Sequence, residues 1–87
     1  MEIKLFDKGI EDFIKSLEKS TIAKVLRTID LLEKFGRKLG PPHTKKISTH
    51  LFELRISGKQ EVIIFYNFHK SQIFLLYGFV KKSQKIP

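Results

Sequence analysis

The chain has 87 residues, of which 41% are hydrophobic and 30% charged, a composition that fits one small globular domain and excludes a disordered chain. No apolar run approaches the roughly 20 residues of a membrane-spanning helix, and the first residues, MEIKLF, lack the apolar core of a signal peptide. The absence of cysteine excludes disulfides, a thiol nucleophile and a zinc–thiolate site. We therefore expect a single cytoplasmic domain over residues 1–87 with no membrane association.

Positive charge is concentrated in the second half of the chain, which has a net charge of +8 overall. Residues 1–40 hold nine Lys and Arg against seven Asp and Glu, a net of +2, whereas residues 41–87 hold eight against two, a net of +6. This asymmetry indicates a polyanionic partner, either nucleic acid or an acidic protein.

The chain begins with a pattern typical of a strand followed by a helix. Polar and apolar residues alternate over residues 2–5, which predicts a short strand. Asp7 can cap a helix whose apolar residues follow at i, i+3, i+4 and i+7 over residues 10–17. One face of this helix should therefore be buried.

A second helix is predicted directly after the first. Ser20 and Thr21 offer side-chain oxygens for its N-terminal cap, and apolar residues recur at helical spacing over residues 22–35. Gly36 suits a C-terminal cap, and the double proline at residues 41–42 cannot continue a helix. The two helices should form an αα-hairpin.

After the prolines the period of the pattern changes from 3.6 to 2. The segment THLFELRIS alternates between two faces, and SGKQ is a hairpin turn signal. EVIIFYNF and QIFLLYGFV are apolar on both faces, which predicts central strands joined by the turn HKSQ. The expected fold class is α+β with the order β-α-α-β-β-β, a helical hairpin packed on one face of a small antiparallel sheet.

The second half also resembles a known family. KKI, LFELRI, IIFYNF and IFLLYGFVKKSQKIP, within residues 45–87, are similar to the RelE/ParE toxin superfamily and most similar to its HigB-like branch, whose members typically read KKL, LWELR, YRIFY and ILLHGFVKKTQKTP. The resemblance implies a toxin of a type II toxin–antitoxin pair that cleaves mRNA on the translating ribosome. It also implies a helix-turn-helix antitoxin as partner, in a hetero-oligomeric complex.

RNA cleavage of this kind needs no side-chain nucleophile, because the 2′-OH attacks the neighbouring phosphate. The protein must help to remove the proton of that hydroxyl and must stabilise the charge that develops on the phosphate. Cationic side chains can neutralise this charge, so we expect neither a metal nor another cofactor. The second half supplies cations at Lys45, Lys46, Arg55, Lys81, Lys82 and Lys85, and aromatic rings suited to base stacking at Tyr66, Tyr77 and Phe79.

Arg55 is the most informative of these cations because it lies within an alternating strand. A guanidinium on a covered surface is costly without a partner, and its planar fork can grip a phosphate at two oxygens. Glu53 lies on the same predicted face two residues earlier, so a structural ion pair is the alternative reading. We expect Arg55 to contact phosphate.

The three lysines after the last predicted strand are open to two interpretations. They either form the rim of an RNA site or solubilise the end of the sheet. Lys81 and Lys82 project to opposite faces if the strand continues, so at most one shares a surface with Arg55. The resemblance places at Lys82 a cation that stabilises the transition state of cleavage, and Lys85 is a further candidate contact.

Histidine can serve as a general acid or base near neutral pH, and the chain has three. His50 opens the predicted strand that leads to Arg55 and is the preferred catalytic candidate, followed by His43 in the loop after the prolines. His69 lies in a predicted turn. For each of them, taken singly, an ordinary surface residue is the favoured interpretation.

One position departs from the pattern of the resembled family. Many ribosome-dependent relatives carry an arginine in the third strand, and this chain has Ile63 there. The departure leaves two alternatives beside the nuclease. One is a ParE-like inhibitor of DNA gyrase, and the other is a degenerate toxin that acts only as an antitoxin partner or an RNA-binding module.

Overall fold

The computed structural model describes residues 1–82 of the chain. The helices and strands, in chain order, are β1 (Glu2–Leu5), α1 (Lys8–Lys15), α2 (Lys19–Phe35), the short 3₁₀ helix η1 (Gly36–Lys38), β2 (Thr44–Lys46), β3 (Phe52–Ile56), β4 (Glu61–His69) and β5 (Gln72–Lys81). None of the helices within residues 1–82 is long and apolar enough to cross a membrane.

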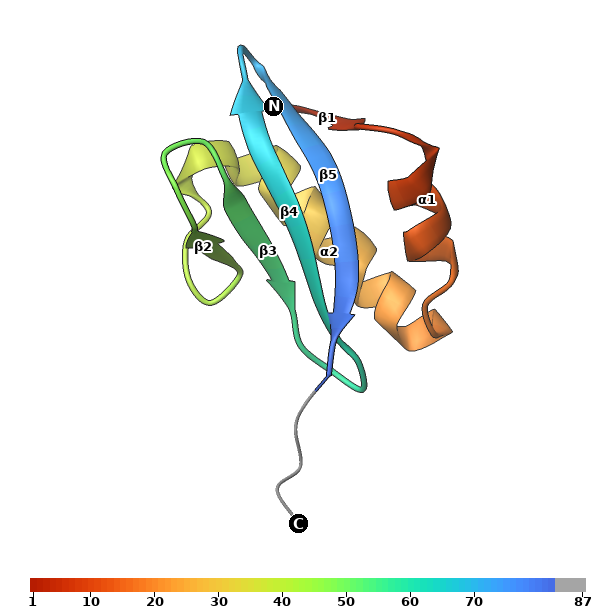
Figure 1. The fold of residues 1–87 in the computed structure, drawn as a ribbon. Coiled ribbons are helices and arrows are strands. Elements are labelled where there is room, and N and C mark those ends of the chain that lie inside the picture. Colours follow the sequence, from red (N-terminus) through yellow and green to blue (C-terminus); the bar gives the residue numbers. More distant parts are fainter. Residues whose placement is uncertain (83–87) are drawn as a thin grey trace.

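The five strands form one mixed sheet in the order β1-β5-β4-β3-β2 (Figure 1). β1 runs parallel to β5, and the other neighbouring strands are antiparallel. The predicted α+β class and the position of the helical hairpin are confirmed. The sheet is mixed, and not antiparallel as expected, because the chain passes through both helices between β1 and the remaining strands.

Two of the three helix caps predicted from the sequence are present in the structure. Asp7 caps α1, since its side chain accepts a hydrogen bond from the backbone N–H of Ile10 at 3.3 Å. Gly36 ends α2 with a φ of 53°, the left-handed region that favours glycine. The predicted cap of α2 is wrong: the helix begins one residue before Ser20, and Thr21 is buried within its first turn.

The core lies between the helices and one face of the sheet. Val25 and Leu32 of α2 pack with Leu54, Ile64 and Leu75 of the three longest adjacent strands, and all five are fully buried. Figure 1 shows α2 behind β3, β4 and β5, with α1 beside β5. Within residues 1–82, no helix covers the opposite side of the sheet, which we call the open face.

Candidate nucleic-acid interface

Two rows of paired residues run across the open face. Directly opposite residues on neighbouring strands project to the same face. The first row joins Lys45 of β2, Glu53 of β3, Phe65 of β4 and Tyr77 of β5. It therefore carries a cation at one end and aromatic rings at the other.

The second row is shorter and lies nearer the β3–β4 turn. It joins Arg55, Ile63 and Phe79, and the pair Glu61 and Lys81 follows on β4 and β5. Ile63, the residue at the place of the arginine in the resembled family, thus lies directly between Arg55 and the ring of Phe79. Its side chain is 5% exposed.

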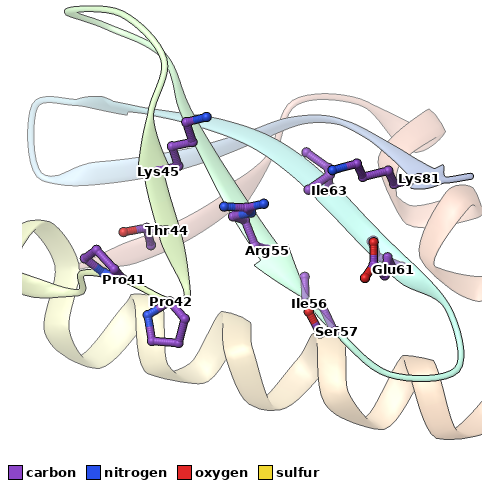
Figure 2. A pocket seen from close by; sticks show the side chains of 11 residues that line it. Pro41, Pro42, Thr44, Lys45, Arg55, Ile56, Ser57, Glu61, Ile63 and Lys81 are labelled. Atoms are coloured by element: carbon purple, nitrogen blue, oxygen red, sulfur yellow. The ribbon is translucent and has the colours of Figure 1, made fainter. Parts of the chain in front are cut away.

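A cavity of about 510 Å³ opens where these residues meet the loop before β2, and we call it the open-face cavity. Figure 2 shows Lys45, Arg55 and Lys81 around it, with Glu61 on β4. Its lining residues are Pro41, Pro42, Thr44, Lys45, Arg55, Ile56, Ser57, Glu61, Val62, Ile63 and Lys81. Three residues that the sequence nominated separately, Lys45, Arg55 and Lys81, therefore line one hollow.

Arg55 is exposed, and its guanidinium is free to accept a ligand. Within residues 1–82, no ion pair joins Arg55 to Glu53 or to another carboxylate, so the structural alternative for Arg55 finds no support. Its backbone N–H donates to the carbonyl oxygen of His43 at 2.8 Å, which extends the pairing of β3 to the residue before the start of β2. The backbone of Arg55 is fixed by this bond while its side chain faces solvent.

Three aromatic rings lie on the open face, and one of them, Phe79, pairs with Ile63 of the cavity lining. The ring centroids of Phe65 and Phe79 are 5.8 Å apart, and those of Phe79 and Tyr77 are 6.4 Å apart. Tyr77 is 62% exposed, an unusual position for a ring in the middle of a central strand. An exposed ring beside unpaired cations can stack on an unpaired base while the cations hold the backbone.

A bulge in β5 puts the rings of Tyr77 and Phe79 on the open face. Phe65 pairs with Tyr77 but Tyr66 pairs with Leu75, so Leu76 is an extra residue between the two pairs. Before the bulge, Ile73 and Leu75 face the core. After it the alternation is inverted, and Tyr77 faces away from the core.

A second hollow of about 270 Å³ lies on the side of α2, and we call it the α2-side groove. Its lining residues are Lys24, Arg27, Thr28, Leu31, Pro42, His43, Arg55, Ile56 and Ser57. It shares Pro42, Arg55, Ile56 and Ser57 with the open-face cavity, so Arg55 belongs to both hollows. His43, one of the two histidines nominated for catalysis, lines this groove.

His50, the other candidate catalytic histidine, does not line the cavity. His50 lies in the turn between β2 and β3 and is exposed. The first residue of β3, Phe52, is already about 10 Å from Arg55 at the usual rise of a strand, and His50 lies beyond it. The structure therefore brings His43, and not His50, beside Arg55.

Tyr66 does not belong to the open face, contrary to its prediction as an RNA-binding residue. It is 2% exposed, and its ring packs against Phe52 and Phe68 at centroid distances of 5.5 and 5.7 Å. Burial raises the pKa of Tyr66, and a hydrogen bond with Thr44 opposes this effect. A base cannot stack on a ring in this position, so we remove Tyr66 from the candidate site.

The remaining lysines are distributed over different surfaces. Lys46 pairs with Phe52 and does not line the open-face cavity; it lines another hollow beside Tyr66, which Lys45 also borders. Lys82 is exposed directly after β5 and does not line the open-face cavity, whereas Lys81 does. Lys85 lies outside the described residues.

Sequence reasoning misses three residues of these two hollows, Glu61, Lys24 and Arg27, and the nearby ring of Phe65. Glu61 is one of two acids in the basic half, and Phe65 is one of many apolar residues in its strand. Lys24 and Arg27 belong to α2, in the half of the chain with little net charge, where nothing in the sequence relates them to Arg55. Only the packing of α2 behind β3 brings them there.

A mixed sheet with two helices on one face, and with cations and rings on the other, defines a small α+β protein with a RelE-like fold. The chain belongs to the phage-derived Gp49-like protein family (DUF891), whose family model matches residues 12–87. This is a family of type II toxins related to RelE-like toxins, and its members have an antitoxin as partner. No curated protein matches the chain.

Proposed function

We propose that this protein is a toxin that cleaves mRNA on the translating ribosome, without a cofactor, through attack of the RNA 2′-OH on the adjacent phosphate. The observation that carries the proposal is the open-face cavity, where Lys45, Arg55 and Lys81 meet without an ion pair within residues 1–82. A toxin that acts on a polyanion needs such unpaired cations, because each ion pair would have to be broken before a phosphate could bind.

In this proposal the cations stabilise the phosphate in the transition state. Arg55 contacts two phosphate oxygens through its fork, and Lys45 and Lys81 neutralise the charge that develops on the phosphate from either side. Ile63 forms an apolar floor below them. Such preorganised donors typically contribute about 10²–10³ each to the rate of a reaction that builds charge on oxygen.

Glu61 is the candidate general base. It is the only carboxylate among the lining residues that the structure describes, and an ionised carboxylate can accept the proton of the 2′-OH. His43 is the alternative, since it lies on the other side of Arg55 in the α2-side groove. Glu61→Gln should abolish most cleavage while RNA binding persists. Retained cleavage in Glu61→Gln, with loss in His43→Gln, would assign the base to His43.

The aromatic rings hold the bases on either side of the scissile bond. Tyr77 and Phe79 present their faces to unpaired bases, and such stacking contributes about 1–3 kcal/mol per base. The substrate is therefore single-stranded RNA, whose unstacked bases can be splayed apart and stacked on aromatic side chains.

The direct test is primer extension on a defined mRNA, with and without translating ribosomes. Discrete cuts that require ribosomes are the expected result, with strong reduction in Arg55→Ala. If expression arrests growth but neither condition gives cuts, the nuclease proposal is wrong. Inhibition of DNA gyrase, the target in the ParE-like alternative, is then assayed next.

We also propose a helix-turn-helix antitoxin as the partner of this single toxin domain, in a cytoplasmic hetero-oligomer. Co-expression of this antitoxin should relieve the growth arrest.

Ile63 favours one second candidate, an RNA-binding protein that does not cleave. An isoleucine stands where the resembled family has an arginine, and it removes one cation from the floor of the cavity. RNA binding that depends on Arg55, with no cleavage on or off the ribosome, would establish this second function.

A further inference from the structure

The α2-side groove and the open-face cavity meet at the edge of β3. β2 begins at Thr44, so at Arg55 this edge is covered only by the loop residue His43, which accepts the backbone N–H of Arg55, and Pro42, Arg55 and Ser57 border both hollows. Arg55 lies where the two hollows meet, so one ligand that contacts Arg55 can extend into both of them.

The charge of the groove is entirely positive. Lys24 and Arg27 of α2 and Arg55 of β3 line it, and no carboxylate of residues 1–82 does so. None of these three cations forms an ion pair within the same range. Lys24 and Arg27 are three residues apart, so they are neighbours on one side of the helix, about 4.5 Å apart along its axis.

The Lys24 ammonium is held at one end of the groove. Its Nζ donates a hydrogen bond to the carbonyl oxygen of Ser57 at 3.1 Å. The same Nζ also lies against Gly58, since a Cβ on Gly58 would be only 2.8 Å from it. An ammonium has three donors, so two stay available to a ligand. A fixed, partly satisfied ammonium costs little to order on binding.

We propose that the α2-side groove binds the backbone phosphates of the same single-stranded RNA, on nucleotides next to those in the open-face cavity. This inference rests on the proposed function, because it extends the RNA path beyond the candidate catalytic residues. Lys24 and Arg27 take adjacent phosphates by charge alone, so the groove adds affinity without base preference. A longer RNA should then bind more tightly than a fragment that fills only the cavity.

The test is fluorescence anisotropy with labelled 2′-O-methyl oligoribonucleotides, which cannot be cleaved because the nucleophile is blocked. A trinucleotide and a dodecamer are compared on the wild type and on Lys24→Gln/Arg27→Gln. The dodecamer should bind the variant at least 10-fold more weakly, and the slope of log affinity against log salt should become shallower by about 1.4, for two lost contacts at about 0.7 each. Binding of the trinucleotide should change less than twofold.

Two further variants test whether the effect on RNA binding depends on where the charges lie, and not on the total charge of the protein or on a loss of folding. Lys8→Gln/Lys19→Gln removes the same charge from exposed residues that line neither hollow, and it should bind the dodecamer like the wild type. Lys24→Arg/Arg27→Lys keeps the charge in the groove and should preserve the salt slope. Equal losses in the two glutamine variants, an equal loss for the trinucleotide, or a preference for duplex RNA would each overturn the inference.

The outcome is separable from the test of the proposed function. A protein that cleaves mRNA, but whose groove variant behaves like its control, would keep the nuclease and reject the groove. A protein that never cleaves, but loses dodecamer affinity specifically in the groove variant, would keep the groove and reject the nuclease.

Discussion

Gly78 provides a stringent test of how the helical hairpin packs, because it permits the closest approach of α1 to the sheet. It pairs with Ile64 on the helix face of β5. A Cβ at this position would lie 2.5 and 2.6 Å from two carbons of the Phe13 ring and 3.3 Å from Cδ1 of Ile10. The glycine of the GFVKKSQKIP motif is thus explained by packing, independently of any role in the site.

The cost of Gly78→Ala follows from these distances. Carbon atoms pack at about 3.5–4.0 Å, so the Phe13 ring must move by roughly 1 Å or rotate out of its place. Overpacking of this kind costs about 1–3 kcal/mol. In a domain of this size each kcal/mol corresponds to about 4–8 °C in Tm, so we expect the midpoint to fall by roughly 5–20 °C.

Thermal unfolding followed by circular dichroism measures this loss, with Gly40→Ala as the matched control. A Cβ at Gly40 has no heavy atom within 4 Å, so that variant should be as stable as the wild type or slightly more stable. Phe13→Leu should restore part of the loss in the Gly78→Ala background, a coupling that a double-mutant cycle detects. A Tm for Gly78→Ala equal to that of Gly40→Ala would refute the packing of α1 described above.

Three further predictions concern the site. Arg55→Ala should relieve growth arrest more than Lys70→Ala, which removes the same charge from the β4–β5 turn; full toxicity of both variants would show that the site lies elsewhere. Ile63→Arg should tighten binding of single-stranded RNA and steepen its salt dependence by about 0.7, as measured by anisotropy; an unchanged slope would mean that this position does not face RNA. Tyr66→Phe should leave RNA binding unchanged. Because burial raises the pKa of Tyr66, the unfolded chain releases its phenol proton first, so the wild type should lose stability relative to Tyr66→Phe as the pH rises above about 10 in urea unfolding experiments.

The sequence predicts the elements with strong periodicity and misses those that depend on pairing. The stripe in α1, the alternation over β3 and the glycine cap of α2 each contain their own signal. β2 has only three residues, too few for alternation to be visible, and it forms because Lys45 and its neighbours pair with β3. The parallel pairing of β1 with β5 is equally invisible, since it joins the two ends of the chain.

The residues of the site divide in the same way into those that the sequence indicates and those that only strand pairing places. The basic second half names Lys45 and Arg55 only as separate candidate cations. That both line one cavity depends on the pairing of β2 with β3, and the three residues of β2 show no visible alternation. The segment around Tyr66 and Tyr77 is apolar on both faces, so its sequence cannot say which ring is buried. The bulge at Leu76 places Tyr77 on the open face, because it inverts the faces on which the residues of β5 before and after it lie. Tyr66 of β4 keeps the core-facing alternation of Val62 and Ile64.

The most direct test of the central claim compares Lys81→Ala with Lys82→Ala in ribosome-dependent cleavage of a defined mRNA, read by primer extension. The two variants remove the same charge from adjacent residues, but only Lys81 lines the open-face cavity. We predict that Lys81→Ala lowers the cleavage rate by roughly 10²-fold, with Lys82→Ala close to the wild type. A loss in Lys82→Ala with full activity in Lys81→Ala would contradict the assignment of the open-face cavity as the RNA site.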